Sequence, residues 1–198
     1  NNEFKKKFLN YWMSESCWMT GYWQSSGYFH EDKSLILTEL TPPPPVDGCY
    51  IGLGKRMRRV NSVAVGVRLY EESNNPNVHG KDGKLKSVSE INSAISKLID
   101  KQKKLYFFIF CSYNSPILDE LNFQGNNVIF VTPDSGFKDS VQSLWLMTQC
   151  RHHVFTNSTF YWWGAWLSRK NYPSVEQIIY SADNFINKDS VELEWNIF

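Results

Sequence analysis

The polar triplet Asn157, Ser158 and Thr159 has the residue types and the setting to bind an anion. It lies between an apolar run, HHVFT, and an aromatic block, FYWWGAWL, which indicates a strand followed directly by a helix. The hydroxyls and backbone amides would then stand at a helix N-terminus, where the helix dipole favours phosphate. Ordinary N-capping explains the same residues, and the NST glycosylation sequon is disfavoured by the bulky aromatics behind it.

Arg68 is the second candidate for chemistry. It comes near the end of the β-branched run Val60–Leu69, and a guanidinium there can bind two phosphate oxygens with its planar fork. The alternative is a surface ion pair with Glu71 or Glu72 in the segment that follows.

Aromatic and polar residues suggest a further contact surface. The segment GYWQSSGYF places Tyr22, Gln24 and Ser25 among aromatics, which is typical of a sugar-contacting loop and equally of a packed corner. In the aromatic block, Phe160, Trp163, Trp166 and Leu167 share one helical face and are predicted to be core. Trp162 lies off that face and is predicted to cover a pocket.

Neither a metal nor a redox site is predicted. His152 and His153 are neighbours on a strand and point to opposite faces, which favours structural roles. Cys17, Cys49, Cys111 and Cys150 lack metal-ligand or C-x-x-C spacing, so free thiols are expected. The motifs typical of dinucleotide oxidoreductases, P-loop ATPases and α/β-hydrolases do not occur.

The elements that must position these residues alternate between strand and helix. Apolar runs predict strands, and helical spacing after Ser87 and Glu90 (a capping box), after Asp139 and after Ser158 predicts helices, with a shorter helix over Pro116–Leu121. The predicted strands are Val60–Leu69, Leu105–Phe110, Asn127–Thr132, His152–Thr156 and Gln177–Ala182.

This alternation predicts an α/β fold: a Rossmann-like parallel sheet with flanking helices. Ligands of such sheets bind outside the carboxyl ends of the strands, where Arg68 and the triplet fall. The proline run TPPPP, Thr41 to Pro45, predicts an extended connector. We therefore expect an aromatic-rich N-terminal part with its connector over residues 1–45 and a Rossmann-like domain over residues 46–198.

Composition narrows the partners. The 198 residues carry a net charge of +1 and are 42% apolar, which gives no global electrostatic reason to expect nucleic acid as a partner. The basic cluster KRMRR, Lys55 to Arg59, is most simply a solvated face, and a polyanion or lipid headgroup contact is the alternative. No apolar run is long enough to span a bilayer, so a cytoplasmic protein is expected, with peripheral association at the inner face of a membrane as a further option.

Taken in order, the segments GYWQSSGYF, SVAVGVRLYEE, FFIF and DSVQSLWLMTQCRHHVFTNSTFYWWGAWL resemble the α-1,2-fucosyltransferases of glycosyltransferase family 11. The last segment is the most specific, since the family typically carries N-S-T-F-S-W-W-G-A-W-L at that place. The resemblance covers residues 21 to 184 approximately and implies the fold of the donor-binding half of a GT-B type enzyme, with residues 46–198 as its nucleotide-sugar-binding domain.

The resemblance implies an inverting transfer of fucose from GDP-fucose to a galactose hydroxyl of a glycan, with no metal and no cofactor beyond the donor. The first arginine of the family's H-x-R-R-x-D motif falls on Arg68 and implies a diphosphate contact. Glu71 takes the aspartate position of the motif, and Ser158 and Thr159 are implied at the donor. The general base is not assigned; Glu71 and His30 are its candidates.

Several positions depart from the family pattern. Gly66 and Leu69 replace the motif's histidine and second arginine, Tyr161 replaces a serine, and no acidic pair follows FFIF. The family's N-terminal G-x-x-G-N-Q segment, on the acceptor side, has no counterpart in the sequence. The alternative function is therefore a noncatalytic nucleotide-sugar or glycan-binding module derived from such an enzyme.

Overall fold

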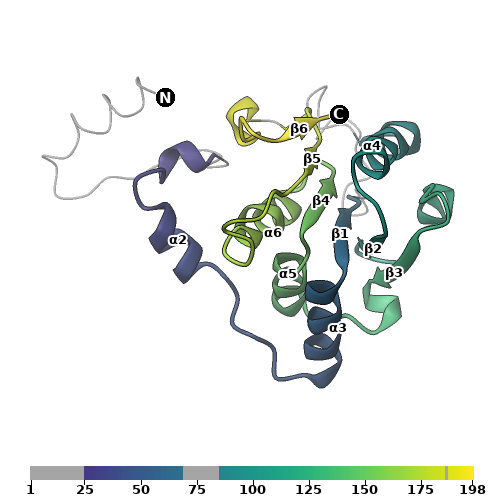
Figure 1. Cartoon of the computed structure of the whole chain (residues 1–198), viewed down its shortest axis with the longest axis horizontal. Coiled ribbons are helices and arrows are strands. Elements are labelled where there is room, and N and C mark those ends of the chain that lie inside the picture. The colour runs from purple at the N-terminus through teal and green to yellow at the C-terminus, as the bar shows by residue number, and fades with distance from the viewer. Residues whose placement is uncertain (1–24, 69–84, 186) are drawn as a thin grey trace, which may run out of the picture.

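The computed structural model describes residues 25–68, 85–185 and 187–198, and these form a six-stranded sheet with helices on both faces (Figure 1). The strands lie in the order β3-β2-β1-β4-β5-β6 and every neighbouring pair is parallel. The strands are β1 (Asn61–Gly66), β2 (Leu105–Phe110), β3 (Asn127–Val131), β4 (His152–Phe155), β5 (Ile179–Ser181) and β6 (Asn196–Ile197). This confirms the predicted parallel α/β fold, with β6 added as a short strand that no apolar run announces.

Two of the described helices and one turn precede the first strand, and the other helices and turns lie between strands. They are α2 (Lys33–Glu39), α3 (Gly48–Arg59), α4 (Val88–Lys101), α5 (Ser140–Thr148) and α6 (Thr159–Ser168), with 3₁₀ turns η1 (Ser26–Tyr28), η2 (Pro116–Glu120), η3 (Pro133–Ser135) and η4 (Lys188–Ser190). Ser87 and Glu90 form the predicted capping box of α4, and Asp139 caps α5 by accepting from the Gln142 amide. The segment predicted as a short helix is the 3₁₀ turn η2.

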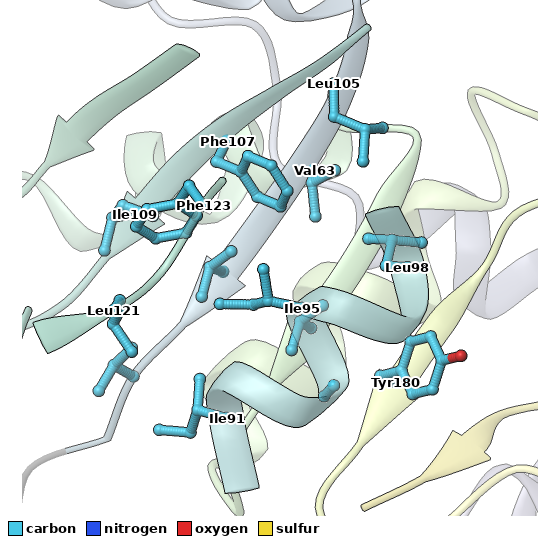
Figure 2. Close-up of a cluster of buried hydrophobic side chains, with 14 of the residues drawn as sticks. Val63, Ile91, Ile95, Leu98, Leu105, Phe107, Ile109, Leu121, Phe123 and Tyr180 are labelled. Carbon is cyan, nitrogen blue, oxygen red and sulfur yellow. The ribbon is translucent and has the colours of Figure 1, made fainter. Parts of the chain in front are cut away.

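The core lies in layers on either side of the sheet. Alternate residues of β1, Val63 and Val65, point toward α4, where they pack with Ile91, Ile95 and Leu98 (Figure 2). On the other face, Ala64 packs with α3 and α5, and α6 covers β4 and β5. Because both faces are covered, β2 and the second half of β1 carry apolar residues without alternation, as the sequence predicts for such strands.

The segment before α3 packs on α6. Phe29 stacks on Trp163 with ring centroids 5.8 Å apart and meets Trp166 edge to face at 5.2 Å, while Ile36 and Leu37 of α2 join the same cluster. Pro42 to Pro45 form neither helix nor strand. Within the described residues, the helices are all too short or too polar to cross a membrane.

Candidate functional site

Strand order reverses between β1 and β4, and the carboxyl ends of these two strands are the switch point at which ligands of such sheets bind, called the crevice below. Gly66 at the end of β1 is paired with Phe155 at the end of β4. Beyond this pair, the Thr156 amide donates to the Gly66 carbonyl at 3.0 Å, and the Arg68 amide donates to Thr156 Oγ1 at 2.8 Å. Arg68 is thus held next to the segment that leads into α6.

The structure places the triplet at the N-terminus of α6, as predicted. Ser158 is the N-cap, with an extended backbone and no capping hydrogen bond from its side chain. The first bond of the helix runs from the Trp162 amide to the Ser158 carbonyl at 2.9 Å. The amides before Trp162 precede the helical ladder, so the first turn of α6 presents backbone donors and the positive end of the helix dipole.

Asn157 and Ser158 are buried, at 8% and 7% exposure, and Thr159 is partly exposed. The Asn157 side-chain amide lies 3.5 Å from the Asn184 carbonyl, which links the triplet to the segment after β5. The sequence-predicted residues Arg68, Asn157, Ser158 and Thr159 are therefore brought together at one crevice.

Tyr161 connects this crevice to β1. Its hydroxyl donates to the Val67 carbonyl at 3.0 Å, and its ring lies so close over Gly66 that a Cβ there would fall 2.4 Å from the ring. Gly66 and Tyr161 are two of the positions that depart from the fucosyltransferase pattern. The structure shows that these two residues are in contact: the Tyr161 ring occupies the space that a side chain at position 66 would fill.

A cavity of about 190 Å³ lies beside Tyr161 at the ends of β2 and β3, and we call it the aromatic slot. The slot lies at the same carboxyl edge of the sheet as Arg68, on the side of β2 and β3. The residues that line it are Phe110, Cys111, Ser112, Val131, Pro133, Phe137, Lys138, Ser140, Ser143, Phe160 and Tyr161. Its walls are mainly apolar and aromatic, with Lys138 and three serines as the polar groups.

The far side of the carboxyl edge carries a charged cluster that the sequence reasoning missed. Lys86, just before α4, pairs with Asp183 after β5 at 2.7 Å and with Glu90 at 3.0 Å. Burial opposes the charge of Lys86, but the bonds to Asp183 and Glu90 outweigh it and raise the Lys86 pKa. Bonds from Ser87 and from Lys86 lower the pKa of Glu90 to about 2. The sequence feature that could have indicated this cluster is a lysine directly before the capping box of α4.

Ser25 belongs to a different cavity. It is buried at 5% exposure and lines a space of about 470 Å³ with Trp166, His30 and the carboxylates of Asp189, Glu192 and Glu194. Trp166 is about two helical turns beyond Ser158, so this cavity, the Ser25 pocket, lies along α6 and apart from the crevice. Tyr22, Gln24 and Glu71 lie outside the described residues.

The prediction that Trp162 covers a pocket is wrong. Trp162 is 2% exposed, packs against Trp166 at 6.1 Å between ring centroids, and donates its indole hydrogen to the Ser190 carbonyl. Trp163, placed in the core by helical spacing, is only partly buried. Helical spacing predicted that the Trp162 side of α6 faces away from the core. The C-terminal segment around η4 packs on that side, and helical spacing alone does not show such contacts with distant segments.

The two histidines of β4 are buried, in line with the predicted structural roles. His152 receives the Ile178 amide on Nδ1 at 2.9 Å and lies 3.1 Å from Asn61 Oδ1 through Nε2. Burial, with Arg151 nearby, lowers the pKa of His152 to about 4, and burial next to His152 lowers that of His153 to about 3. Within the described ranges, the His, Cys, Asp and Glu side chains form no metal-binding group.

The fold and the crevice define a Rossmann-like α/β protein, the architecture that binds nucleotides at its strand-order switch point. The family model of glycosyl transferase family 11 matches residues 2–198, so the chain belongs to this family. The α-1,2-colitosyltransferase of Escherichia coli is 30% identical to it over 175 residues, which cover 87% of the chain and 57% of that enzyme. The chain thus spans little more than half the length of this relative, and no solved structure matches it.

Proposed function

We propose that the chain is the donor-binding half of a glycosyltransferase that moves a deoxy sugar from a GDP-linked donor to a galactose hydroxyl, in α-1,2 linkage. The observation that carries the proposal is the hydrogen bond from the Arg68 amide to Thr156 Oγ1, 88 residues further along the chain, which holds Arg68 beside the segment that leads into α6 at the switch point. A guanidinium and the positive N-terminal end of a helix together suit a diphosphate. Family membership gives this anion its chemical context.

In the proposed complex, the diphosphate lies between Arg68 and the first turn of α6. The nucleobase then extends into the aromatic slot, because Tyr161 borders both places and the slot has aromatic walls for a planar ring. The polar groups at its rim, Lys138 and Ser112 among them, can bond the heteroatoms of a base.

This arrangement supports a metal-free, inverting transfer. Breaking the bond between sugar and phosphate leaves negative charge on the diphosphate, and donors that bind this charge most strongly in the transition state lower the barrier. The sugar carbon becomes oxocarbenium-like and is attacked by the acceptor hydroxyl from the face opposite the leaving GDP, which inverts the configuration. The hydroxyl proton passes to a general base as the new bond forms. Arg68 and the α6 amides supply the stabilisation without a metal ion.

The donor sugar is fucose or its 3-deoxy analogue colitose. The resemblance of the sequence motifs favours fucose, and the name of the E. coli relative favours colitose. The acceptor is a galactose-containing glycan, and the Ser25 pocket, with its carboxylates and Trp166, is the proposed place for its more distant units.

Calorimetric titration with GDP and UDP tests the donor site. We expect GDP to bind more tightly than UDP, and Arg68→Ala to weaken GDP binding about thirtyfold, since a charged hydrogen bond contributes about 2 kcal/mol. Arg59→Ala, at the exposed end of α3, is the matched control and should bind GDP normally. A preference for UDP, or unchanged GDP affinity in folded Arg68→Ala, would show that the diphosphate lies elsewhere.

Incubation with GDP-fucose or GDP-colitose and a galactose-terminated oligosaccharide, followed by mass spectrometry and NMR of the product, tests the transfer. An α-linked product at the galactose 2-hydroxyl supports the enzyme, and its mass identifies the sugar. Tight GDP-sugar binding without any transfer would favour the noncatalytic binding module instead.

A further inference from the structure

The amino edge of the sheet, opposite the crevice, collects basic side chains from segments far apart in the sequence. The end of α3 supplies Lys55, Arg56, Arg58 and Arg59, and the turn between α4 and β2 supplies Lys103 and Lys104. All six side chains are exposed. Arg151, directly before β4, and Lys170, two residues after α6, extend the same edge. We call this surface the basic edge.

Contacts between the segments show that they form one continuous surface. The Arg56 guanidinium lies 5.9 Å from the ring of Tyr106 at the start of β2. Arg58 donates to the Asn171 carbonyl at 3.3 Å and lies over the Tyr172 ring at 5.2 Å. The end of α3 is therefore tied both to β2 and to the loop between α6 and β5.

The basic edge gathers far more positive than negative charge. Basic residues at the end of α3 complement its helix dipole, and Lys103 and Lys170 directly follow the C-caps of α4 and α6, so the C-terminal ends of three helices gather positive charge at this edge. The acidic residues of these segments are Asp100 and Glu176. Since the whole chain carries only +1, the positive charge is concentrated here and balanced elsewhere.

We propose that the basic edge binds the anionic lipid headgroups of a membrane surface. Clusters of four to eight exposed Lys and Arg residues attract such surfaces, each contributing about fivefold to affinity. A single-stranded nucleic acid would need aromatic rings on which bases stack. The rings of this edge, Tyr106 and Tyr172, are instead covered by Arg56 and Arg58.

Binding through this edge would turn the crevice at the carboxyl edge away from the bilayer. An acceptor attached to lipid would then have to reach the crevice with the outer end of its glycan. The surface assignment itself rests on charge and exposure, so it stands whether or not the donor proposal is correct.

Flotation with lipid vesicles tests the proposal. We expect the protein to float with vesicles of mixed phosphatidylcholine and phosphatidylglycerol, to remain behind with pure phosphatidylcholine, and to be released by salt. Lys103→Gln with Lys104→Gln should weaken binding to the anionic vesicles on the order of twentyfold. The control, Lys97→Gln with Lys138→Gln, removes the same charge from exposed sites outside the basic edge.

Circular dichroism and thermal unfolding confirm that both double variants are folded. An equal loss in both variants, equal binding to neutral vesicles, or no binding at low salt would overturn the proposal. Duplex DNA and heparin are measured at the same salt, and tighter binding to either than to anionic vesicles would assign the surface to a soluble polyanion instead.

Discussion

At the scale of single residues, Gly66 and Tyr161 determine how β1 ends. The Tyr161 ring lies on the Gly66 backbone, and its hydroxyl fixes the Val67 carbonyl, one residue before Arg68. A side chain at position 66 and a tyrosine at position 161 therefore exclude one another. The small residue at one site and the large one at the other are a matched pair that orients the end of β1.

Gly66→Ala tests this pair. The added Cβ would fall 2.4 Å from Tyr161 Cγ, and the ring must move, which we expect to lower the free energy of unfolding by about 1–3 kcal/mol. Gly52→Ala, on α3 with open space around it, should instead be neutral or raise stability by up to about 1 kcal/mol. Denaturant unfolding gives both values. If Tyr161→Ser does not relieve the cost of Gly66→Ala in the double variant, the two positions are not coupled.

At the scale of elements, β4 illustrates what sequence patterns can and cannot supply. Its apolar run and the NST triplet after it predicted the strand and the start of α6, because both signals are local. The cover over Trp162 comes from η4, and the strand β6 gains its place only by pairing with β5. These features depend on contacts between distant segments, which periodicity does not report.

The two histidines of β4 should make stability depend on pH. Their folded pKa values, about 4 for His152 and about 3 for His153, lie below the unfolded value near 6.5, so the unfolded chain binds the extra protons. Stability is therefore full above about pH 6.5 and falls as the pH drops toward 4, by up to about 1.4 kcal/mol per pH unit for each histidine.

Denaturant unfolding at a series of pH values measures this dependence. His152→Asn keeps an acceptor near the Ile178 amide. Between about pH 6.5 and 4, the free energy of unfolding of this variant should fall less steeply with decreasing pH, because one of the two buried histidines is gone. His30→Asn leaves both strand histidines in place and should keep the slope. An unchanged slope in His152→Asn would mean that this side chain is not the titrating group.

At the scale of the whole molecule, the site depends on the order of the strands in the sheet. Arg68 and Ser158 each follow a strand, and the rule for parallel sheets predicts from sequence that both lie at one edge. That they are neighbours depends on the pairing of β1 with β4, which skips the two strands between them in the chain. The basic edge has the same origin, since sheet order places Lys103 and Lys170 near α3.

The segment from residue 25 to residue 45 is held to the sheet through α6, and Phe29 is its main anchor. Phe29 packs on Trp163 and Trp166, so Phe29→Ala should loosen this segment by about 1–3 kcal/mol, somewhat less than a fully buried phenylalanine loses. Hydrogen exchange of the α2 amides should accelerate, while β1 and β2 keep their protection because their core lies on α4 and α5. Leu35→Ala, at an exposed position of α2, is the control. Uniform acceleration across the sheet would show instead that residues 25–45 and the sheet unfold as one unit.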